Sequence, residues 1–281
     1  MLTGSELLRS LQNRLKLNDL WSRRPSVLDT PVERPVFVTG SARSGTSITH
    51  ELLDCDPAVR APLLWEMLHP VERSEGTGSP GRAQTADRAY RFWHQLQPEY
   101  ESMHFNAGSL PNECIYIFLV SFLSDQFAGC HHIPSYSAHL SSADHRSIYR
   151  EHRRVLQTLE PGSESARWVL KAPSHLSMLR SLFSVYPDAR VVITHRDPVQ
   201  CLSSALSLMG TLQWMRSEHV DLEPLVREMP AQQADLWQDV QSARSSGELP
   251  DSQFIDVRYC DLVADPAFAI GRNYRELEWE Y

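Results

Sequence analysis

Short apolar runs alternate with amphipathic stretches along much of the chain. The runs are rich in β-branched residues and end at turn-forming or polar residues; they lie at 35–39, 168–171, 190–195 and 253–259. Apolar residues at helical spacing follow the first three runs, at 48–53, 176–183 and 199–209. Strands that alternate with helices predict an α/β fold with a mainly parallel sheet covered on both faces. Its active crevice is expected at the carboxyl ends of the strands.

The other segments are predicted to be mostly helical. Leucines near helical spacing indicate a helical leader in residues 1–34, in which Pro25 and Pro31 end the pattern. Amphipathic helices are expected over about 57–165, including a buried helix at 113–127 and a flexible turn at 76–81. We expect one domain over residues 1–281, because the length suits a single α/β domain better than two smaller ones.

Composition narrows the function classes. The chain of 281 residues carries a formal net charge of −8, which argues against non-specific binding of nucleic acid or of an anionic membrane. The five cysteines are scattered without a C-x-x-C pair, which favours a reducing compartment. No signal-peptide layout opens the chain, and the most apolar run, 114–123, is too short to span a bilayer. These features predict a cytoplasmic protein without an integral membrane segment.

The loop after the first predicted strand has the composition of an anion site. Residues 40–47 read Gly-Ser-Ala-Arg-Ser-Gly-Thr-Ser between a strand and a helix, so backbone N–H groups and the helix N-terminus converge there. Gly40 and Gly45 keep the Walker spacing, but Thr46 stands where the Walker lysine belongs, which argues against ATP or GTP hydrolysis. Arg43 is the only cation of the loop, and hydroxyl groups come from Ser44, Thr46 and Ser47.

A second anion contact is expected after the strand at 190–195. Arg196 follows it, Pro198 suits the first turn of a helix, and Ser204 lies eight residues beyond Arg196. Ser204 then lies about two turns along this helix, where its hydroxyl could join Arg196 on one phosphate. The alternative is that Arg196 pairs with Asp197 or caps a neighbouring helix.

Taken together, these motifs resemble the sulfotransferases that use 3′-phosphoadenosine 5′-phosphosulfate (PAPS). Residues 40–47 resemble their 5′-phosphosulfate loop, and Arg196 with Ser204 resembles their 3′-phosphate site. The segment 257–266 is similar to their Tyr-Glu-Asp-Leu-x-x-x-Pro segment, with Cys260 in place of the glutamate. An arginine in the loop and a Lys-Ala-Pro after the next strand are closer to the bacterial and tyrosylprotein-type branch than to the cytosolic animal enzymes.

The resemblance implies a P-loop-type sheet flanked by helices, with a helical insertion over the active site. It implies sulfonate transfer from PAPS to a hydroxyl acceptor by in-line attack, with 3′-phosphoadenosine 5′-phosphate (PAP) as product and no metal required. The implied cofactor-binding residues are Ser41, Ala42, Arg43, Ser44, Gly45, Thr46, Ser47, Arg196, Ser204 and Tyr259. The family usually continues well past the position of Pro266, so this sequence is expected to be short at its C-terminal end.

Catalytic roles follow from side-chain chemistry and from the resemblance together. The planar guanidinium of Arg43 suits the tetrahedral 5′-phosphosulfate. Lys171 lies at the expected crevice, where tyrosylprotein-type enzymes carry a lysine that stabilises the leaving oxygen. Two residues compete as the general base. Glu66 lies where the tyrosylprotein-type enzymes place their glutamate, and His104 lies at a distance from Arg43 similar to that of the histidine in cytosolic enzymes. We favour Glu66.

Several other features leave alternatives open. A histidine-rich segment resembles a metal cluster but lacks ligand spacing for zinc; its members are His131, His132, His139, His145 and His152. Aromatic residues in the middle of the chain favour an apolar small molecule, or a carbohydrate or lipid-type hydroxyl, as acceptor. The alternatives to a sulfotransferase are a P-loop small-molecule or nucleotide kinase and a non-catalytic PAP-binding protein. The sequence leaves a homo-oligomer open.

Overall fold

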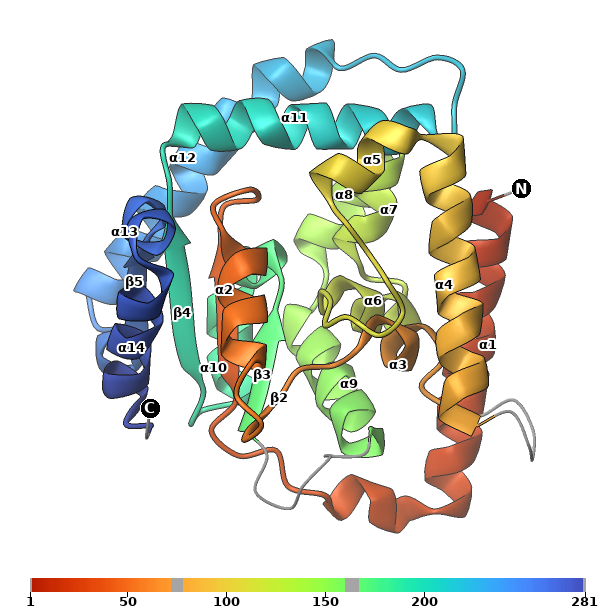
Figure 1. The fold of residues 1–281 in the computed structure, drawn as a ribbon, viewed down its shortest axis with the longest axis horizontal. Helices are drawn as coiled ribbons and strands as arrows, with labels where there is room; N and C mark the ends of the chain where they lie inside the picture. The colour runs from red at the N-terminus through yellow and green to blue at the C-terminus, as the bar shows by residue number, and fades with distance from the viewer. Residues whose placement is uncertain (1, 72–77, 160–166, 280–281) are drawn as a thin grey trace. The chain divides into compact units, whose positions relative to one another are not determined.

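The computed structural model describes residues 2–71, 78–159 and 167–279 (Figure 1). The chain divides into two compact units built from interleaved segments. The helical unit comprises residues 1–32, 62–161 and 208–220, and the sheet unit comprises 33–61, 162–207 and 221–281. Within the described residues, no helix is both long enough and apolar enough to cross a bilayer.

The sheet unit contains one 5-stranded sheet in the order β2-β3-β1-β4-β5, and every neighbouring pair is parallel. The strands are β1 (Val36–Gly40), β2 (Val59–Arg60), β3 (Arg167–Lys171), β4 (Arg190–His195) and β5 (Phe254–Arg258). The predicted strands at 35–39, 168–171, 190–195 and 253–259 are confirmed, as is the parallel sheet. The two-residue strand β2 was not predicted, because so short an edge strand carries no pattern.

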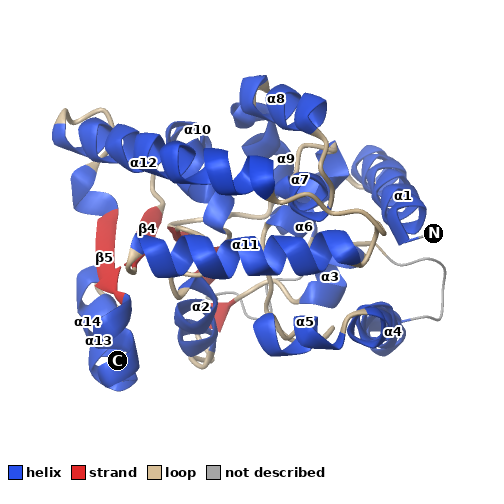
Figure 2. Cartoon of the chain, turned by 90° about the horizontal axis from the view of Figure 1, so that it is seen from above, coloured by secondary structure: helices blue, strands red, loops and turns tan. Residues whose placement is uncertain are grey.

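Helices connect the strands and cover both faces of the sheet (Figure 2). They are α2 (Thr46–Asp54), η3 (Pro173–Met178), α10 (Leu179–Val185), α12 (Glu223–Ser245), η4 (Asp251–Gln253), α13 (Tyr259–Ala264) and α14 (Pro266–Leu277). Helix α11 (Pro198–Trp214) starts in the sheet unit after β4, and its residues from 208 onward belong to the helical unit. The helices predicted from 48, 176 and 199 onward are confirmed. Pro173 and Pro198 each stand at the start of their helix, where the missing N–H costs no hydrogen bond.

The two faces of the sheet follow from the alternation of side chains along each strand. On one face, Val36 and Val38 of β1 join a buried apolar cluster with residues of α2, α13 and α14. On the other face, Phe37 packs against His175 and Tyr186, with ring centroids 4.9 and 5.3 Å away. Helix α10 and helix α12 cover this second face over β5, where Phe183 and Arg244 both contact the Phe254 ring.

The described part of the helical unit consists of helices that range from 3 to 22 residues in length. They are α1 (Leu2–Arg23), η1 (Pro25–Asp29), α3 (Leu64–Leu68), α4 (Gly78–Leu96), α5 (Pro98–Met103), α6 (Ile115–Phe118), η2 (Leu119–Ser121), α7 (Asp125–Cys130), α8 (Pro134–Ser142) and α9 (His145–Thr158). The prediction of a mostly helical segment is confirmed, but the single helix at 113–127 is wrong. Phe122 adopts a left-handed conformation with φ of 59°, and the Ser124 hydroxyl accepts a hydrogen bond from the Gln126 N–H, which starts α7 afresh.

The turn expected at 76–81 is corrected in part. Residues 76 and 77 lie outside the described residues, and residues 78–81 form the start of α4.

The N-terminal helix α1 buries a different face from the one its leucines mark. Leu8 and Leu15 are exposed, whereas Glu6 and Asn13 are buried. Glu6 pairs with Arg216 at 2.8 Å, and the Asn13 side chain donates to the Leu68 carbonyl at 2.9 Å. A buried polar group is tolerated when it is paired, so Glu6 and Asn13 can share the buried face of α1 with Leu17 and Trp21.

Candidate active site

The β1–α2 loop, residues 40–47, is held in a shape that requires its two glycines. Gly40 and Gly45 have φ angles of 146° and 106°, which side chains rarely adopt. A Cβ atom at Gly40 would lie 2.5 Å from the Thr194 carbonyl oxygen, and one at Gly45 would lie 2.7 Å from the Tyr259 ring. The loop therefore lies tight against β4 and the start of α13.

Between the glycines, Arg43 adopts a left-handed conformation with φ of 70°. A non-glycine residue there costs about 1–2 kcal/mol, and such strain is typical of functional loops. The Ser44 N–H donates to the Ser41 carbonyl at 3.1 Å, which closes a tight turn. Helix α2 begins at Thr46, so the positive end of its dipole adjoins the loop.

The predicted phosphate-binding cations lie together at this loop. The Arg43 Nε donates to the Ser204 Oγ at 3.0 Å, and an Arg196 Nη1 donates to the Arg43 carbonyl at 3.0 Å. The Arg196 guanidinium also stacks over the Tyr259 ring, 4.4 Å from its centroid. Asp197 instead accepts a hydrogen bond from a backbone N–H at the start of α11. Residues from three distant segments therefore converge on one positively charged end.

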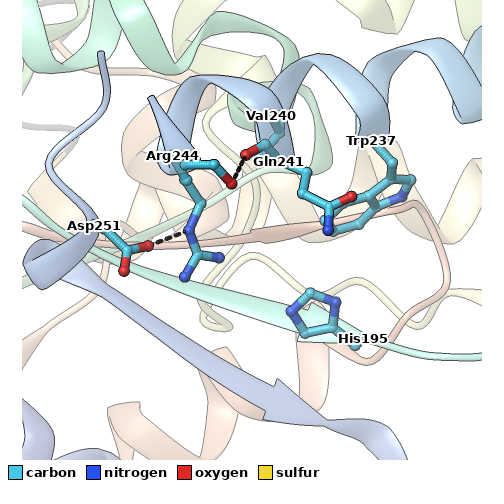
Figure 3. Close-up of a pocket in the computed structure, with 7 residues that line it drawn as sticks. His195, Trp237, Val240, Gln241, Arg244 and Asp251 are labelled. Atoms are coloured by element: carbon cyan, nitrogen blue, oxygen red, sulfur yellow. Dashed lines mark hydrogen bonds and ion pairs between the residues drawn. The ribbon is translucent and has the colours of Figure 1, made fainter. Parts of the chain in front are cut away.

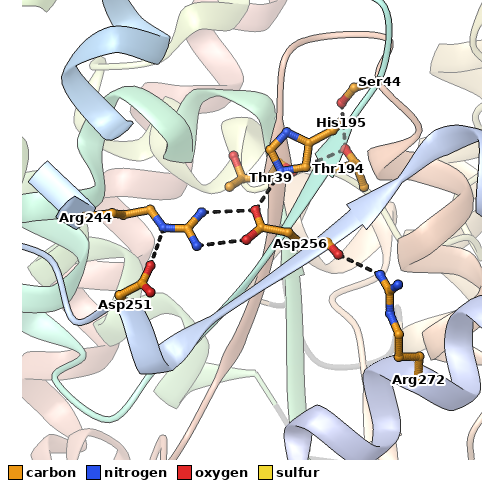
Figure 4. Close-up of polar contacts among 8 residues, drawn as sticks. All are labelled: Thr39, Ser44, Thr194, His195, Arg244, Asp251, Asp256 and Arg272. Atoms are coloured by element: carbon orange, nitrogen blue, oxygen red, sulfur yellow. Dashed lines mark hydrogen bonds and ion pairs between the residues drawn. The ribbon is translucent and has the colours of Figure 1, made fainter. Parts of the chain in front are cut away.

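The loop hydroxyls differ in their surroundings. Ser44 is buried, and its Oγ lies 2.6 Å from the Thr194 Oγ1 (Figure 4). Since the Thr194 hydroxyl donates to the Thr39 carbonyl, Ser44 must be the donor of this pair. Ser44 thereby joins the loop to β4. Ala42 has no polar side chain, so only its backbone can contact a ligand.

Lys171 lies at the carboxyl end of β3, beside the loop. Its side chain is only 2% exposed, and its Nζ donates to the Ser47 Oγ at 3.1 Å. A buried ammonium needs polar partners, and Ser47 in the first turn of α2 is one of them. The carboxyl ends of β1, β3 and β4 thus bring Lys171, Arg43 and Arg196 to the same edge of the sheet.

The two candidate bases belong to the helical unit. Glu66 lies on α3 and is 7% exposed, and its Oε2 accepts a hydrogen bond from the Leu63 N–H at 2.8 Å. The carboxylate thus caps the first turn of its own helix. His104 follows α5, where its backbone N–H donates to the Tyr100 carbonyl at 2.8 Å. Its ring lies edge-on to the Tyr100 ring, 6.2 Å between centroids.

Residues 35–281 match the family model described as the sulfotransferase family. The chain belongs to this family. The match begins at β1 and includes the β1–α2 loop, Lys171, Arg196 and Tyr259.

Solved sulfotransferases share the fold. The crystal structure of sulfotransferase STF1 from Mycobacterium tuberculosis H37Rv has a TM-score of 0.83 and 33% identity, and the match covers 98% of this chain and 75% of that one. Sulfotransferase STF9 from Mycobacterium avium has a TM-score of 0.80 and 27% identity, over 98% and 71% of the two chains.

A curated relative carries a more specific name. The omega-hydroxy-beta-dihydromenaquinone-9 sulfotransferase Stf3 of Mycobacterium bovis is 24% identical over 254 residues, which are 86% of this chain. The chain spans 62% of the length of that relative.

The histidines of the histidine-rich segment, 131–152, lie on or beside helices α7, α8 and α9. Within residues 2–71, 78–159 and 167–279, no group of three or more His, Cys, Asp and Glu side chains is arranged to hold a metal ion. His152 is fully buried on α9, and burial lowers its pKa to about 3, so the ring is neutral. The ring of His145 instead lies 2.9 Å from the Leu140 carbonyl.

Sequence reasoning missed a charged network on the α12 side of β4 and β5. The His195 ring lies 2.6 Å from the Asp256 carboxylate, which also accepts two hydrogen bonds from Arg244 at 3.0 and 2.8 Å (Figure 4). The Arg244 Nε donates to Asp251 at 2.7 Å. Burial alone would raise the pKa of Asp256, but the hydrogen bonds from His195 and Arg244 outweigh it and lower the pKa.

This network lines a pocket of about 500 Å³ against α12 (Figure 3). Its walls are His195, Trp237, Val240, Gln241, Arg244, Ser245 and Asp251. His195 directly precedes Arg196, so the network adjoins the carboxyl end of β4. In the sequence, the network is indicated by Asp256 alone, which interrupts the apolar residues of β5. This pattern does not identify the residues that pair with Asp256.

Proposed function

We propose that this chain transfers a sulfonate group from PAPS to the hydroxyl of a small organic acceptor. The observation that carries the proposal is the convergence of Arg43, Arg196 and Ser204 at the β1–α2 loop, which gathers two guanidinium groups and a hydroxyl group for an anionic ligand. The absence of a cation at Thr46, which is 4% exposed, favours a sulfonate donor over a nucleoside triphosphate.

In this proposal, two groups of side chains bind the two ends of the donor. The loop N–H groups and Arg43 bind the 5′-phosphosulfate, because a guanidinium fork matches tetrahedral oxyanions. Arg196 and Ser204 bind the 3′-phosphate, and Tyr259 keeps the Arg196 guanidinium in position by stacking. The donors of the two contacts are the Arg43 Nε and an Arg196 Nη1, and each could donate to a phosphate oxygen instead. The observed geometry is therefore compatible with a bound phosphate.

Sulfonate transfer requires stabilisation of the negative charge that develops and the transfer of one proton. PAPS supplies the sulfonate: the acceptor oxygen forms a bond to sulfur while the bond from sulfur to the phosphate oxygen breaks, and PAP leaves with that electron pair. Lys171 and Arg43 stabilise the negative charge on the leaving oxygen and on the sulfonate. The general base takes the proton of the acceptor hydroxyl.

Glu66 is the preferred base and His104 the alternative. A buried carboxylate fixed by the Leu63 N–H is held in one orientation, which a base requires. The same hydrogen bond gives Glu66 a structural role as a helix cap, so replacement by alanine would remove both. Glutamine keeps the side-chain oxygen for Leu63 but cannot take a proton, and it separates the two roles.

The acceptor is proposed to be an apolar or lipid-type alcohol. The name of the Mycobacterium bovis relative specifies a hydroxylated menaquinone, which favours this class over a carbohydrate. Of the middle aromatic residues, Trp93, Tyr100, Tyr116 and Phe118 are buried in the helical unit, and Phe105 is exposed. We also propose a cytoplasmic location, where thiols such as the exposed Cys55 and Cys260 stay reduced.

Calorimetric titration of the purified chain with PAP, beside Mg-ATP, tests the proposal. We expect PAP to bind with a dissociation constant of about 1 μM or lower, and ATP to bind much more weakly. Arg43→Ala is expected to weaken PAP binding by about 100-fold, since it removes a charge-assisted fork. Tighter binding of Mg-ATP than of PAP would favour the kinase alternative instead.

The base assignment is tested on the same preparations with a sulfonate acceptor. Glu66→Gln is expected to leave PAP binding within twofold and to lower kcat by about 10²–10⁴-fold. His104→Gln serves as the matched comparison and should retain most of the activity. The reverse ranking would make His104 the base, and PAP binding without turnover of any acceptor by the unaltered chain would favour a non-catalytic PAP-binding protein.

A further inference from the structure

The first hydroxyl of the β1–α2 loop is bonded to helix α12. The Ser41 Oγ donates to the Gln233 Oε1 at 2.9 Å and accepts a hydrogen bond from the Trp237 Nε1 at 2.9 Å. An indole N–H can only donate, so the hydrogen of the Ser41 hydroxyl is directed to Gln233. The Ser41 hydroxyl therefore donates to α12 and does not donate to a phosphate oxygen. Ser41 can contribute to an anion site mainly through its backbone N–H.

Gln233 and Trp237 are one helical turn apart, so they lie on the same face of α12 and can hold one hydroxyl between them. Their position is fixed by contacts further along the helix. The Trp237 ring packs against the His195 ring, with centroids 5.2 Å apart, and Arg244 joins α12 to Asp251 and Asp256 (Figures 3 and 4). The bidentate pair between Arg244 and Asp256 restrains both distance and orientation.

The backbone of the β1–α2 loop is strained at Arg43. Arg43 lies in a left-handed conformation that its side chain disfavours, and the Ser41 carbonyl closes the turn that contains it. A strained loop persists only when its surroundings fix it, and a binding site gains affinity when its groups are already in place.

We propose that helix α12 holds the β1–α2 loop in its anion-binding conformation by a two-point clamp on the Ser41 hydroxyl, with Gln233 and Trp237 as positioning residues. The identity of the ligand, PAP, rests on the proposed function. The clamp itself rests on the contacts between α12 and Ser41. The clamp touches neither phosphate, so its effect on binding passes through the position of the loop.

Two conservative variants remove one point of the clamp each. Trp237→Phe keeps an aromatic ring against His195 and deletes the N–H, and Gln233→Leu keeps the side-chain volume and deletes the acceptor. Gln232→Leu is the matched control, because Gln232 is the exposed neighbour of Gln233 on the same helix. We expect about three- to tenfold weaker PAP binding for each clamp variant, and a change within twofold for the control.

A double-mutant cycle separates positioning from general destabilisation. Ser41→Ala should weaken PAP binding by a similar factor, and Trp237→Phe should have no further effect in the Ser41→Ala background, because the bond is already lost. Ser41→Thr keeps the hydroxyl and should restore binding. Additive losses, or unaltered binding in both clamp variants, would overturn the proposal.

Hydrogen exchange of the free protein tests the clamp without any ligand. The amides of residues 41–47 should exchange faster in Trp237→Phe and Gln233→Leu than in Gln232→Leu, whereas the amides of β1 and β4 should not change. Failure of the unaltered chain to bind PAP would contradict the proposed function alone. Equal exchange in all variants would contradict the clamp, whatever PAP does.

Discussion

The two faces of the sheet at β4 and β5 differ in the kind of interaction they make. On one face, Val192, Ile255 and Val257 pack in an apolar cluster with α13 and α14. On the other face, the same strands present His195 and Asp256 to the charged side chains of α12. Apolar burial is strong and non-directional, whereas charge-assisted hydrogen bonds add modest energy and fix orientation. Stability and positioning are thus divided between the two faces.

The largest effect is expected on the apolar face. Leu53 of α2 is fully buried there, so Leu53→Ala should lower the free energy of unfolding by about 2–5 kcal/mol, because it leaves a cavity as well as losing burial. Urea unfolding measures the loss. The folded fraction should still bind PAP, since Leu53 belongs to the apolar cluster and not to the β1–α2 loop. A loss below 1 kcal/mol would mean that this face contributes less than its burial implies.

An intermediate, pH-dependent effect is expected on the charged face. Asp256→Asn removes the charge shared by His195 and Arg244, and its half-exposed position limits the loss at pH 7 to about 1 kcal/mol. The folded state lowers the pKa of Asp256, so the carboxylate stabilises the fold above its unfolded pKa of about 4. This contribution is lost as the pH falls toward the lower, folded pKa.

Urea unfolding of both proteins at pH 7 and near pH 3 measures this difference. The stability of the unaltered protein should approach that of Asp256→Asn at the lower pH. A difference that stays constant between the two pH values would mean that Asp256 acts through its shape rather than its charge.

The smallest effect is expected where the charges of α12 are exposed. Arg180 of α10 pairs with Asp239 and Glu248, both at 2.6 Å, and all three side chains are about half exposed. Arg180→Met should lower the midpoint of urea unfolding slightly in low salt and not at all in 1 M NaCl, because solvent and salt screen such pairs. A loss that persists in high salt would show that this pair behaves like the one at Asp256.

The difference between the faces also explains what the sequence could predict. The strands, the β1–α2 loop and the positions of the candidate residues Arg43, Lys171 and Arg196 all follow from local signals, namely short apolar runs with glycine or charge at their ends. Parallel pairing then brings the ends together without further information. The bond between Ser41 and Trp237 could not be predicted, since it joins segments almost two hundred residues apart through a single hydroxyl.

The helical unit was harder to predict for a related reason. Its buried polar groups are stabilised by individual partners, such as Arg216 for Glu6. The periodicity of apolar residues does not predict such pairs. The apolar run at 113–127 looked like one helix because its composition says nothing of the left-handed residue Phe122 that breaks it. The roles of Glu66 and His104 stay predictions, since each also has a local structural explanation.

The left-handed backbone of Arg43 sets stability against the proposed role of its side chain. At φ of 70°, glycine would be the more stable residue by about 1 kcal/mol, because it alone avoids the Cβ clash. Any engineering that optimises stability alone would choose glycine at this position and discard the guanidinium that we propose binds the anion. An arginine at a position whose backbone favours glycine therefore marks a candidate functional residue, and such positions can be sought in the loops of other chains.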